Sequence, residues 1–159
     1  LQLNTMTVKK KFYGALNSIF SKSKYLAEPV KLQLVESFCL PILVYCIGAL
    51  DVSRSMLNDL SVCWNNAFRK IFCYNRWESV RELQFFCGCL DFKHIYDIYR
   101  YKFLINIKSR LPFLSPFFNA LEHQHNRLVL LRDNYKCSGI SSSMVTASIR
   151  EHFNDTACL

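Results

Sequence analysis

The sequence is poor in the residues that form tight turns: its 159 residues include only four glycines and four prolines. A β-sandwich or β-barrel needs turn residues about every 8–12 positions, so this scarcity favours helices. Long apolar runs are also missing. The longest uncharged stretch, residues 37–50, is shorter than the ~20 residues that span a bilayer, and Pro41 interrupts it. We therefore expect an all-α protein without a membrane partner.

Motifs of a self-contained active site are missing as well. The chain has no Asp-Asp or Asp-x-Asp pair that could hold two metal ions, no glycine-rich phosphate loop and no G-x-S-x-G elbow. A general acid–base or nucleophilic mechanism would need such groups to be positioned together. The sequence therefore predicts no enzyme activity for this chain by itself.

Cysteine and histidine are present, but not at the spacing of a metal site. The closest pairs are Cys87-Gly88-Cys89 and His123-Gln124-His125. A structural zinc site needs two pairs with longer internal gaps, such as C-x2-C. Most of the eight cysteines fall in apolar runs, where a free thiol behaves as a small hydrophobic side chain. We expect reduced thiols, no metal or other cofactor in this chain, and an intracellular protein.

Positive charge is what the sequence has in excess, with 20 basic and 12 acidic residues and a net charge of +8. This excess favours an anionic partner, a nucleic acid or a lipid surface. Basic side chains gather in two clusters, and the second includes Trp64, Tyr74 and Trp77, whose rings could stack on bases. The alternative is a solvated basic face beside core aromatics, and Trp64 lies on an apolar stripe typical of a core. The candidate nucleic-acid contacts are Lys9, Lys10, Lys11, Lys22, Lys24, Arg69, Lys70, Arg76 and Arg81.

Apolar residues recur at helical spacing along most of the chain. The pattern predicts helices near residues 7–20, from 28 to a break at Pro41, from 42 to 50, from a cap at Ser53 through Ile71, and from Asn75 through Phe86. Further helices are expected at 91–108, at 116–131 and, weakly, at 145–153. We expect a compact bundle of about five to seven helices with a linker near 111–116 and a looser C-terminal helical segment.

Three stretches are more specific than composition. They read EPVKLQLVESFCLPILVYCIGAL (28–50), LNDLSVCWNNAFRKIFCYNRWESVREL (57–83) and LDFKHIYDIYRYKFL (90–104), after KKKFYGALNSIF (9–20). Together they resemble the region that follows the catalytic palm in reverse transcriptases of non-LTR (LINE-class) retrotransposons. The resemblance covers about residues 8–105.

The resemblance implies a thumb-like helical domain, which we assign to residues 1–110. The linker near 111–116 then leaves residues 111–159 as a C-terminal helical extension. A thumb grips the template–primer duplex, RNA–DNA or DNA, and packs against a palm. The catalytic carboxylates of the family's palm, which lie in an aromatic-x-Asp-Asp segment, do not occur in this chain. The resemblance thus implies a non-catalytic fragment of an RNA-directed DNA polymerase, whose parent would use a divalent metal, expected to be Mg²⁺, and would be nuclear in an active element.

Two alternatives to duplex binding stay open. The first is a helical protein–protein interaction module derived from a transposon remnant, which would be marked by an exposed apolar patch. The second is a membrane-surface helix set built on the lysines at 9–11, although neighbouring helices offer partners for its apolar stripe. Because the chain begins with Leu1 rather than Met, we also expect a fragment of a longer protein.

Overall fold

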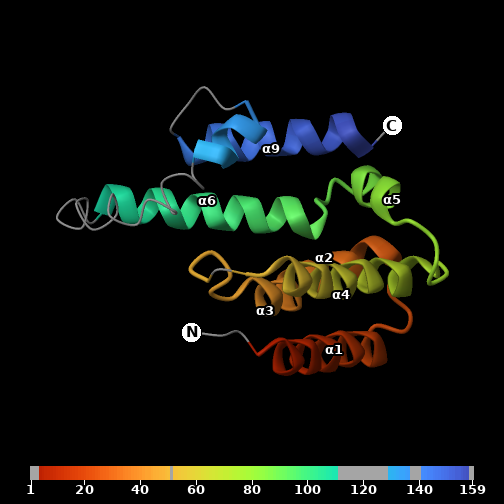
Figure 1. The fold of residues 1–159 in the computed structure, drawn as a ribbon. Coiled ribbons are helices and arrows are strands. Elements are labelled where there is room, and N and C mark those ends of the chain that lie inside the picture. Colours follow the sequence, from red (N-terminus) through yellow and green to blue (C-terminus); the bar gives the residue numbers. More distant parts are fainter. Residues whose placement is uncertain (1–3, 51, 111–128, 137–140, 158–159) are drawn as a thin grey trace.

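The computed structural model describes residues 4–50, 52–110, 129–136 and 141–157, and all regular structure in these ranges is helical. The prediction of an all-α helical bundle is confirmed. Figure 1 shows the helices stacked in layers, with α1 on one side, α2 to α4 in the middle, and α6 and then α9 on the other side. The helices are α1 (Thr5–Lys22), α2 (Glu28–Phe38), α3 (Leu40–Val44), α4 (Arg54–Phe72), α5 (Arg81–Phe86), α6 (Phe92–Arg110) and α9 (Ser142–Ala157), with one further helical turn at 129–134.

Short polar side chains and prolines set the helix boundaries. The Asn4 side chain accepts a hydrogen bond from the backbone N–H of Thr7, and Ser53 does the same for Met56, both at 3.2 Å. Such N-caps satisfy backbone donors that have no partner inside the helix. The predicted break near Pro41 is present: α2 ends at Phe38 and α3 begins at Leu40, with proline in its first turn.

The core is centred on α4, whose apolar stripe faces the neighbouring helices. Trp64 is 0% exposed, and its indole N–H donates to the carbonyl of Leu90 at 3.0 Å. Its ring meets that of Phe68 edge to face, with the centroids 5.1 Å apart. The expectation that Trp64 belongs to the core is therefore confirmed. The other buried residues of α4 are Leu60, Cys63, Ala67 and Ile71.

The segment after α3 docks closely on α6. A Cβ atom at Gly48 would lie 2.7 Å from the carbonyl oxygen of Tyr99, so only glycine fits this contact. The buried Arg100 secures the same junction by donating to the carbonyl of Gly48 at 2.7 Å and to that of Leu50 at 3.3 Å. The charged side chain of Arg100 thus connects α6 to the segment that follows α3 in the middle layer.

One predicted helix is shorter than the sequence suggests. Residues 73–80 form a loop rather than the start of a helix, and α5 begins only at Arg81. Asn75, where that helix was expected to begin, closes a turn instead: its backbone N–H donates to the Glu78 carboxylate at 2.5 Å. Trp77, which falls within the predicted helix, lies on this loop and is 83% exposed. The prediction was wrong because this local turn competes with the helix.

The C-terminal helix is longer than the expected 145–153. Val145, Ile149, Phe153 and Ala157 recur every four residues and are buried. They belong to the same apolar cluster as the core of α4, and α9 packs on α6 and α5. The division of the chain at residue 110 stays a prediction. The expected linker at 111–116, most of the helix at 116–131 and the His123–His125 pair lie outside the described residues.

None of the described helices combines the length and apolar character that crossing a bilayer requires.

Candidate nucleic-acid interface

Helices α1 and α4 lie side by side and run in the same direction. Three polar contacts join them. From one contact to the next, the residue numbers rise along both helices, which shows that the helices are parallel. The C-terminal ends of α1 and α4 therefore lie at the same end of the bundle, where the loops at 23–27 and 73–80 begin (Figure 1). The contacts are Lys9–Asp59 at 2.9 Å, Tyr13–Asn66 at 3.0 Å and Lys70–Asn17 at 2.6 Å.

This end of the bundle carries large aromatic rings that face solvent. Tyr25 is 93% exposed, Trp77 is 83% exposed, and Tyr74 is also exposed. The Lys24 ammonium lies 5.8 Å from the centre of the Tyr25 ring. We call this region the basic–aromatic end. Its members are the cations Lys22, Lys24, Lys70 and Arg76 and the rings Tyr25, Tyr74 and Trp77.

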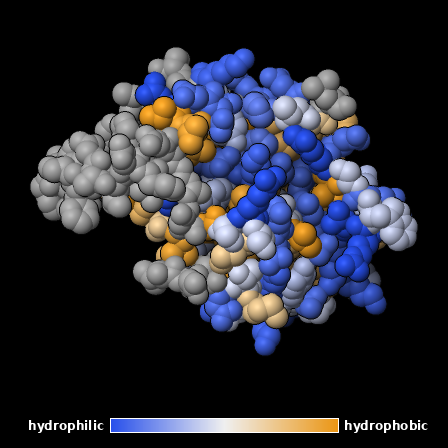
Figure 2. Space-filling view, viewed as in Figure 1, coloured by the Kyte–Doolittle hydropathy of each residue, from blue (hydrophilic) through white to orange (hydrophobic). Residues whose placement is uncertain are grey.

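Four of the predicted lysines are exposed on α1 or just after it: Lys10, Lys11, Lys22 and Lys24. No acidic residue occurs in α1, so nothing within that helix offsets their charge. Figure 2 shows a largely hydrophilic face with a few small apolar patches. The α1 lysines thus continue the positive charge of the basic–aromatic end along one helix.

Lys9 differs from its neighbours because it is already paired. Its ammonium group lies 2.9 Å from the carboxylate of Asp59 on α4. The hydrogen bond with Asp59 raises the pKa of Lys9, against a smaller opposing effect of desolvation. This ion pair joins α1 to α4. Because the Asp59 carboxylate offsets the positive charge of Lys9, Lys9 should attract a phosphate less strongly than its neighbours do.

Two predicted arginines bind their own chain. Arg69 donates through Nε and Nη2 to the carbonyl of Glu78, at 3.2 and 3.0 Å, and through Nη1 to Asn66. Arg81 donates to the hydroxyl of Thr156 on α9 at 2.7 Å, and its guanidinium lies 5.9 Å from the Phe153 ring. Arg69 holds the 73–80 loop and Arg81 joins α5 to α9. By contrast, Arg76 is exposed within that loop.

Lys70 combines an internal contact with exposure. Its ammonium donates to the Asn17 side chain at 2.6 Å and lies 4.7 Å from the centre of the Phe20 ring. The side chain is nevertheless exposed, and an ammonium group has three donors. Lys70 is thus held at a defined place in the basic–aromatic end while two donors remain for a ligand.

A second polar site lies between α6 and α9, and sequence reasoning missed it. His94 is 4% exposed; its Nδ1 lies 2.5 Å from Asp91 Oδ1, and its Nε2 lies 3.4 Å from Nδ1 of His152. The two histidines are 58 positions apart, so spacing could not pair them. The Asp91-x-x-His94 spacing at the start of α6 was the one available signal. A cavity of about 400 Å³ opens beside them.

The two carboxyl groups of this cavity differ in their environments. Burial alone would raise the pKa of Asp91, but the hydrogen bonds from the ring and backbone N–H of His94 and the charge of that ring outweigh it and lower the pKa. Burial raises the pKa of Asp97, although the hydroxyl of Tyr135 donates to its carboxylate and partly opposes this effect. Asp91 therefore favours the ionised form more than Asp97 does.

In the ranges that the structure describes, no group of three or more His, Cys, Asp or Glu side chains is arranged to hold a metal ion. The described cysteines are free thiols. Burial raises the pKa of the Cys39 thiol to about 11 and raises the pKa of Cys89 further, with help from the nearby Glu36 carboxylate. Such thiols are poor nucleophiles at neutral pH.

Comparisons with known proteins found no similar family, protein or structure. No protein-family model matches the chain, and searches of curated proteins and of solved structures found no match. The resemblance to reverse transcriptases therefore depends on the sequence segments quoted above.

Proposed function

We propose that this chain binds a nucleic-acid duplex through the basic–aromatic end, as the thumb of a non-LTR retrotransposon reverse transcriptase. One observation carries the proposal: exposed cations and exposed aromatic rings gather at a single end of the bundle, on the last turns of α1 and α4 and on the loops that follow them. The sequence resemblance supports the same function independently. The chemistry of polymerisation would belong to a palm in the parent protein.

The two kinds of side chain have different roles in this proposal. Lys22, Lys24, Lys70 and Arg76 contact phosphates, while Lys10 and Lys11 extend the contact along α1. Neutralising a phosphate releases bound counterions, so affinity falls as salt rises. Contacts of this kind read the shape and backbone of a duplex and not its base sequence.

Trp77 has the more specific role. A tryptophan ring in water can stack on a base that is not covered by a neighbouring base pair, a contact of about 1–3 kcal/mol. Such a base is available at the end of a duplex or in a single-stranded overhang. Trp77 therefore favours the junction between the primer end and the template strand, with the lysines on the adjoining duplex.

Tryptophan fluorescence tests this proposal, because the two tryptophans of the chain differ in exposure. An RNA–DNA duplex with a short template overhang is titrated into the protein at low salt. We expect binding with a Kd on the order of 1–10 µM and quenching of Trp77 emission on stacking. The Trp77→Phe variant should bind but show little quenching, since the buried Trp64 cannot reach a base.

The controls separate stacking from charge. A blunt duplex of the same length should bind through phosphates with much less quenching. Absence of binding at low salt, or equal quenching in the Trp77→Phe variant, would contradict the proposal.

A further inference from the structure

The loop at 73–80, which carries Trp77, is held at both of its ends. At its start, the backbone N–H of Tyr74 donates to the carbonyl of Arg69 at 2.9 Å, which closes the end of α4. At its other end, Val80 is 3% exposed and belongs to the apolar core. The loop therefore has little freedom to move as a whole.

The middle of the loop is held by Glu78, the residue that follows Trp77. The Glu78 carboxylate accepts the backbone N–H of Asn75 at 2.5 Å. Its carbonyl accepts Nε and Nη2 of Arg69 at 3.2 and 3.0 Å. These contacts fix the backbone on both sides of Trp77, while its ring stays 83% exposed.

The contacts of Arg69 continue to α1. Its Nη1 donates to the side-chain oxygen of Asn66 at 3.1 Å, and the Asn66 amide nitrogen donates to the hydroxyl of Tyr13 at 3.0 Å. These bonds are partly buried, where a hydrogen bond is stronger than in open water. We call Tyr13, Asn66, Arg69 and Glu78 the polar network. It connects α1, through α4, to the backbone beside Trp77.

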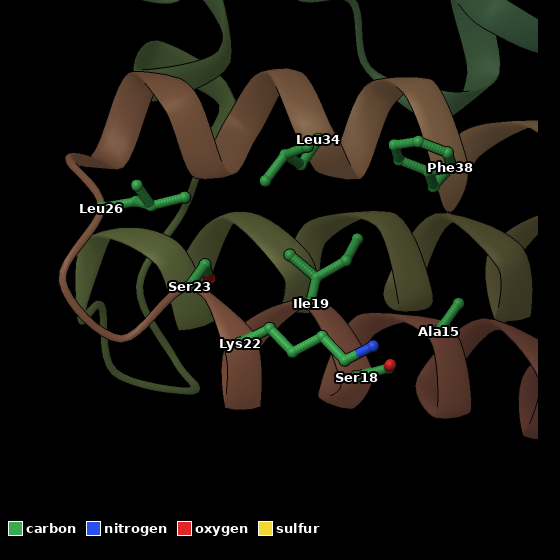
Figure 3. A pocket seen from close by; sticks show the side chains of 8 residues that line it. All are labelled: Ala15, Ser18, Ile19, Lys22, Ser23, Leu26, Leu34 and Phe38. Carbon is green, nitrogen blue, oxygen red and sulfur yellow. The ribbon is translucent and has the colours of Figure 1, made fainter.

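The cations at the end of α1 lie on an element that is itself held in place. In Figure 3, Leu34 of α2 points toward Ile19 of α1, and the side chain of Lys22 extends back along α1. Ser23, which follows Lys22, is 3% exposed, and its backbone N–H donates to the carbonyl of Ile19 at 2.8 Å. The polar network thus joins two ordered parts of the basic–aromatic end, the α1 cations and the loop of Trp77.

We propose that Tyr13, Asn66 and Arg69 are positioning residues of the basic–aromatic end, and that their network makes it prefer the end of a duplex to a free single strand. This inference rests on the proposed function. A duplex end presents its last base and its phosphates at fixed distances, so a ring and cations that are already in place lose little freedom on binding. A single strand can bend to bring its bases to a ring wherever that ring lies, so it gains less from the network.

Titrations of two ligands test the inference: the RNA–DNA duplex with a template overhang, and its template strand alone. The main variant is Asn66→Ala, which breaks the network without changing the net charge. It should weaken binding of the duplex about three- to tenfold and reduce the quenching of Trp77, while binding of the single strand changes less than about twofold. The slope of log affinity against log salt should stay the same, because no phosphate contact is removed.

A second variant and a matched control locate the effect. Tyr13→Phe removes only the hydroxyl at the far end of the network, with little risk to folding, and should weaken duplex binding about twofold. The control is Asn65→Ala. Asn65 neighbours Asn66 on α4, but its side-chain oxygen accepts a hydrogen bond from Gln84 of α5 at 3.0 Å. The control should therefore keep both the preference for the duplex and the quenching of Trp77.

Two results would overturn the inference and leave the proposed function standing. The first is duplex binding by Asn66→Ala and Tyr13→Phe that is as tight as that of the unsubstituted protein. The second is a loss in Asn66→Ala that is equal for the two ligands or no greater than the loss in Asn65→Ala. No binding of the duplex by the unsubstituted protein would instead contradict the proposed function, and this inference with it.

Discussion

The basic–aromatic end and the cavity between α6 and α9 use charge in opposite ways. Between α6 and α9, the polar groups face one another: His94 contacts both Asp91 and His152, and Tyr135 donates to Asp97. At the basic–aromatic end the cations outnumber their internal partners and face solvent. Charges that are paired within the chain stabilise the fold, whereas charges of the same residue types without such pairing are open to a ligand.

The two tryptophans show the same contrast within one short stretch of sequence. Trp64 is fully buried and its indole N–H has a backbone acceptor, whereas Trp77 is 83% exposed on a loop. The first stabilises the core, and the second is the proposed stacking surface. Substitutions in the two regions should therefore have different effects on stability and on binding.

The largest effect is expected for Trp64→Ala. Removing this side chain leaves a cavity in the centre of α4's contacts and should cost about 3–5 kcal/mol of unfolding free energy. Trp77→Ala should change the same quantity by less than about 0.5 kcal/mol. Urea denaturation followed by circular dichroism measures both. Similar destabilisation by the two variants would contradict the assignment of Trp77 to the surface.

The next effect concerns pH and the cavity between α6 and α9. The folded-state pKa of Asp91 is lowered, so its ionised form stabilises the fold above the unfolded-state pKa of about 3.9, and this stability is lost as pH falls through the lowered pKa. Asp91→Asn should cost about 2 kcal/mol at pH 7. The difference from the unsubstituted protein should shrink in acid.

Asp97→Asn is the matched control for this prediction. Its folded-state pKa is raised, so its contribution is greatest below the unfolded-state pKa and is lost as pH rises through the folded value. The variant should therefore lose less stability at pH 7 than Asp91→Asn does. Thermal unfolding of both variants at several pH values measures these losses. A larger loss for Asp97→Asn than for Asp91→Asn at neutral pH would contradict the assigned environments.

A smaller effect separates two arginines of the same cluster. Arg69→Gln removes donors to the Glu78 carbonyl and should cost about 1 kcal/mol of unfolding free energy. Arg76→Gln should leave stability unchanged and weaken duplex binding. Paired urea denaturation and binding titrations test this. Equal stability of both variants would show that Arg69 does not hold the loop.

The smallest effect is expected for Lys9→Gln. Because Lys9 is paired with Asp59, its removal should weaken duplex binding less than Lys22→Gln does, in the same titration at the same salt. A larger loss for Lys9→Gln would show that the ion pair opens when nucleic acid binds.

Much of the fold could be predicted because its signals are local. The spacing of apolar residues in α4, the cap at Ser53 and the break at Pro41 each act within a few residues. The loop at 73–80 could not be predicted, since its stability comes from Arg69 and the Glu78 carboxylate and carbonyl acting together. The contact between His94 and His152 could not be predicted either, because it arises only from the packing of α9 on α6.

The candidate site was partly predictable for the same reason. Composition identified the basic residues, but it could not distinguish Arg81, which binds Thr156, from Arg76, which faces solvent. Trp77 could be named as a ring able to stack on bases, but its place on a loop could not be predicted. Residue type therefore predicted the chemistry of the site, and tertiary contacts decided which members are open to a ligand.

The most direct test of the account compares two variants of equal net charge. One replaces Lys22, Lys24, Lys70 and Arg76 with glutamine, and the other replaces four exposed cations of the opposite side, Lys93, Lys102, Lys136 and Arg150. The measurement is the slope of log affinity against log salt for an RNA–DNA duplex. The first variant should lose about 3–4 units of slope, and the second should keep most of its slope. Equal losses would show that binding follows net charge alone and would contradict the basic–aromatic end as the interface.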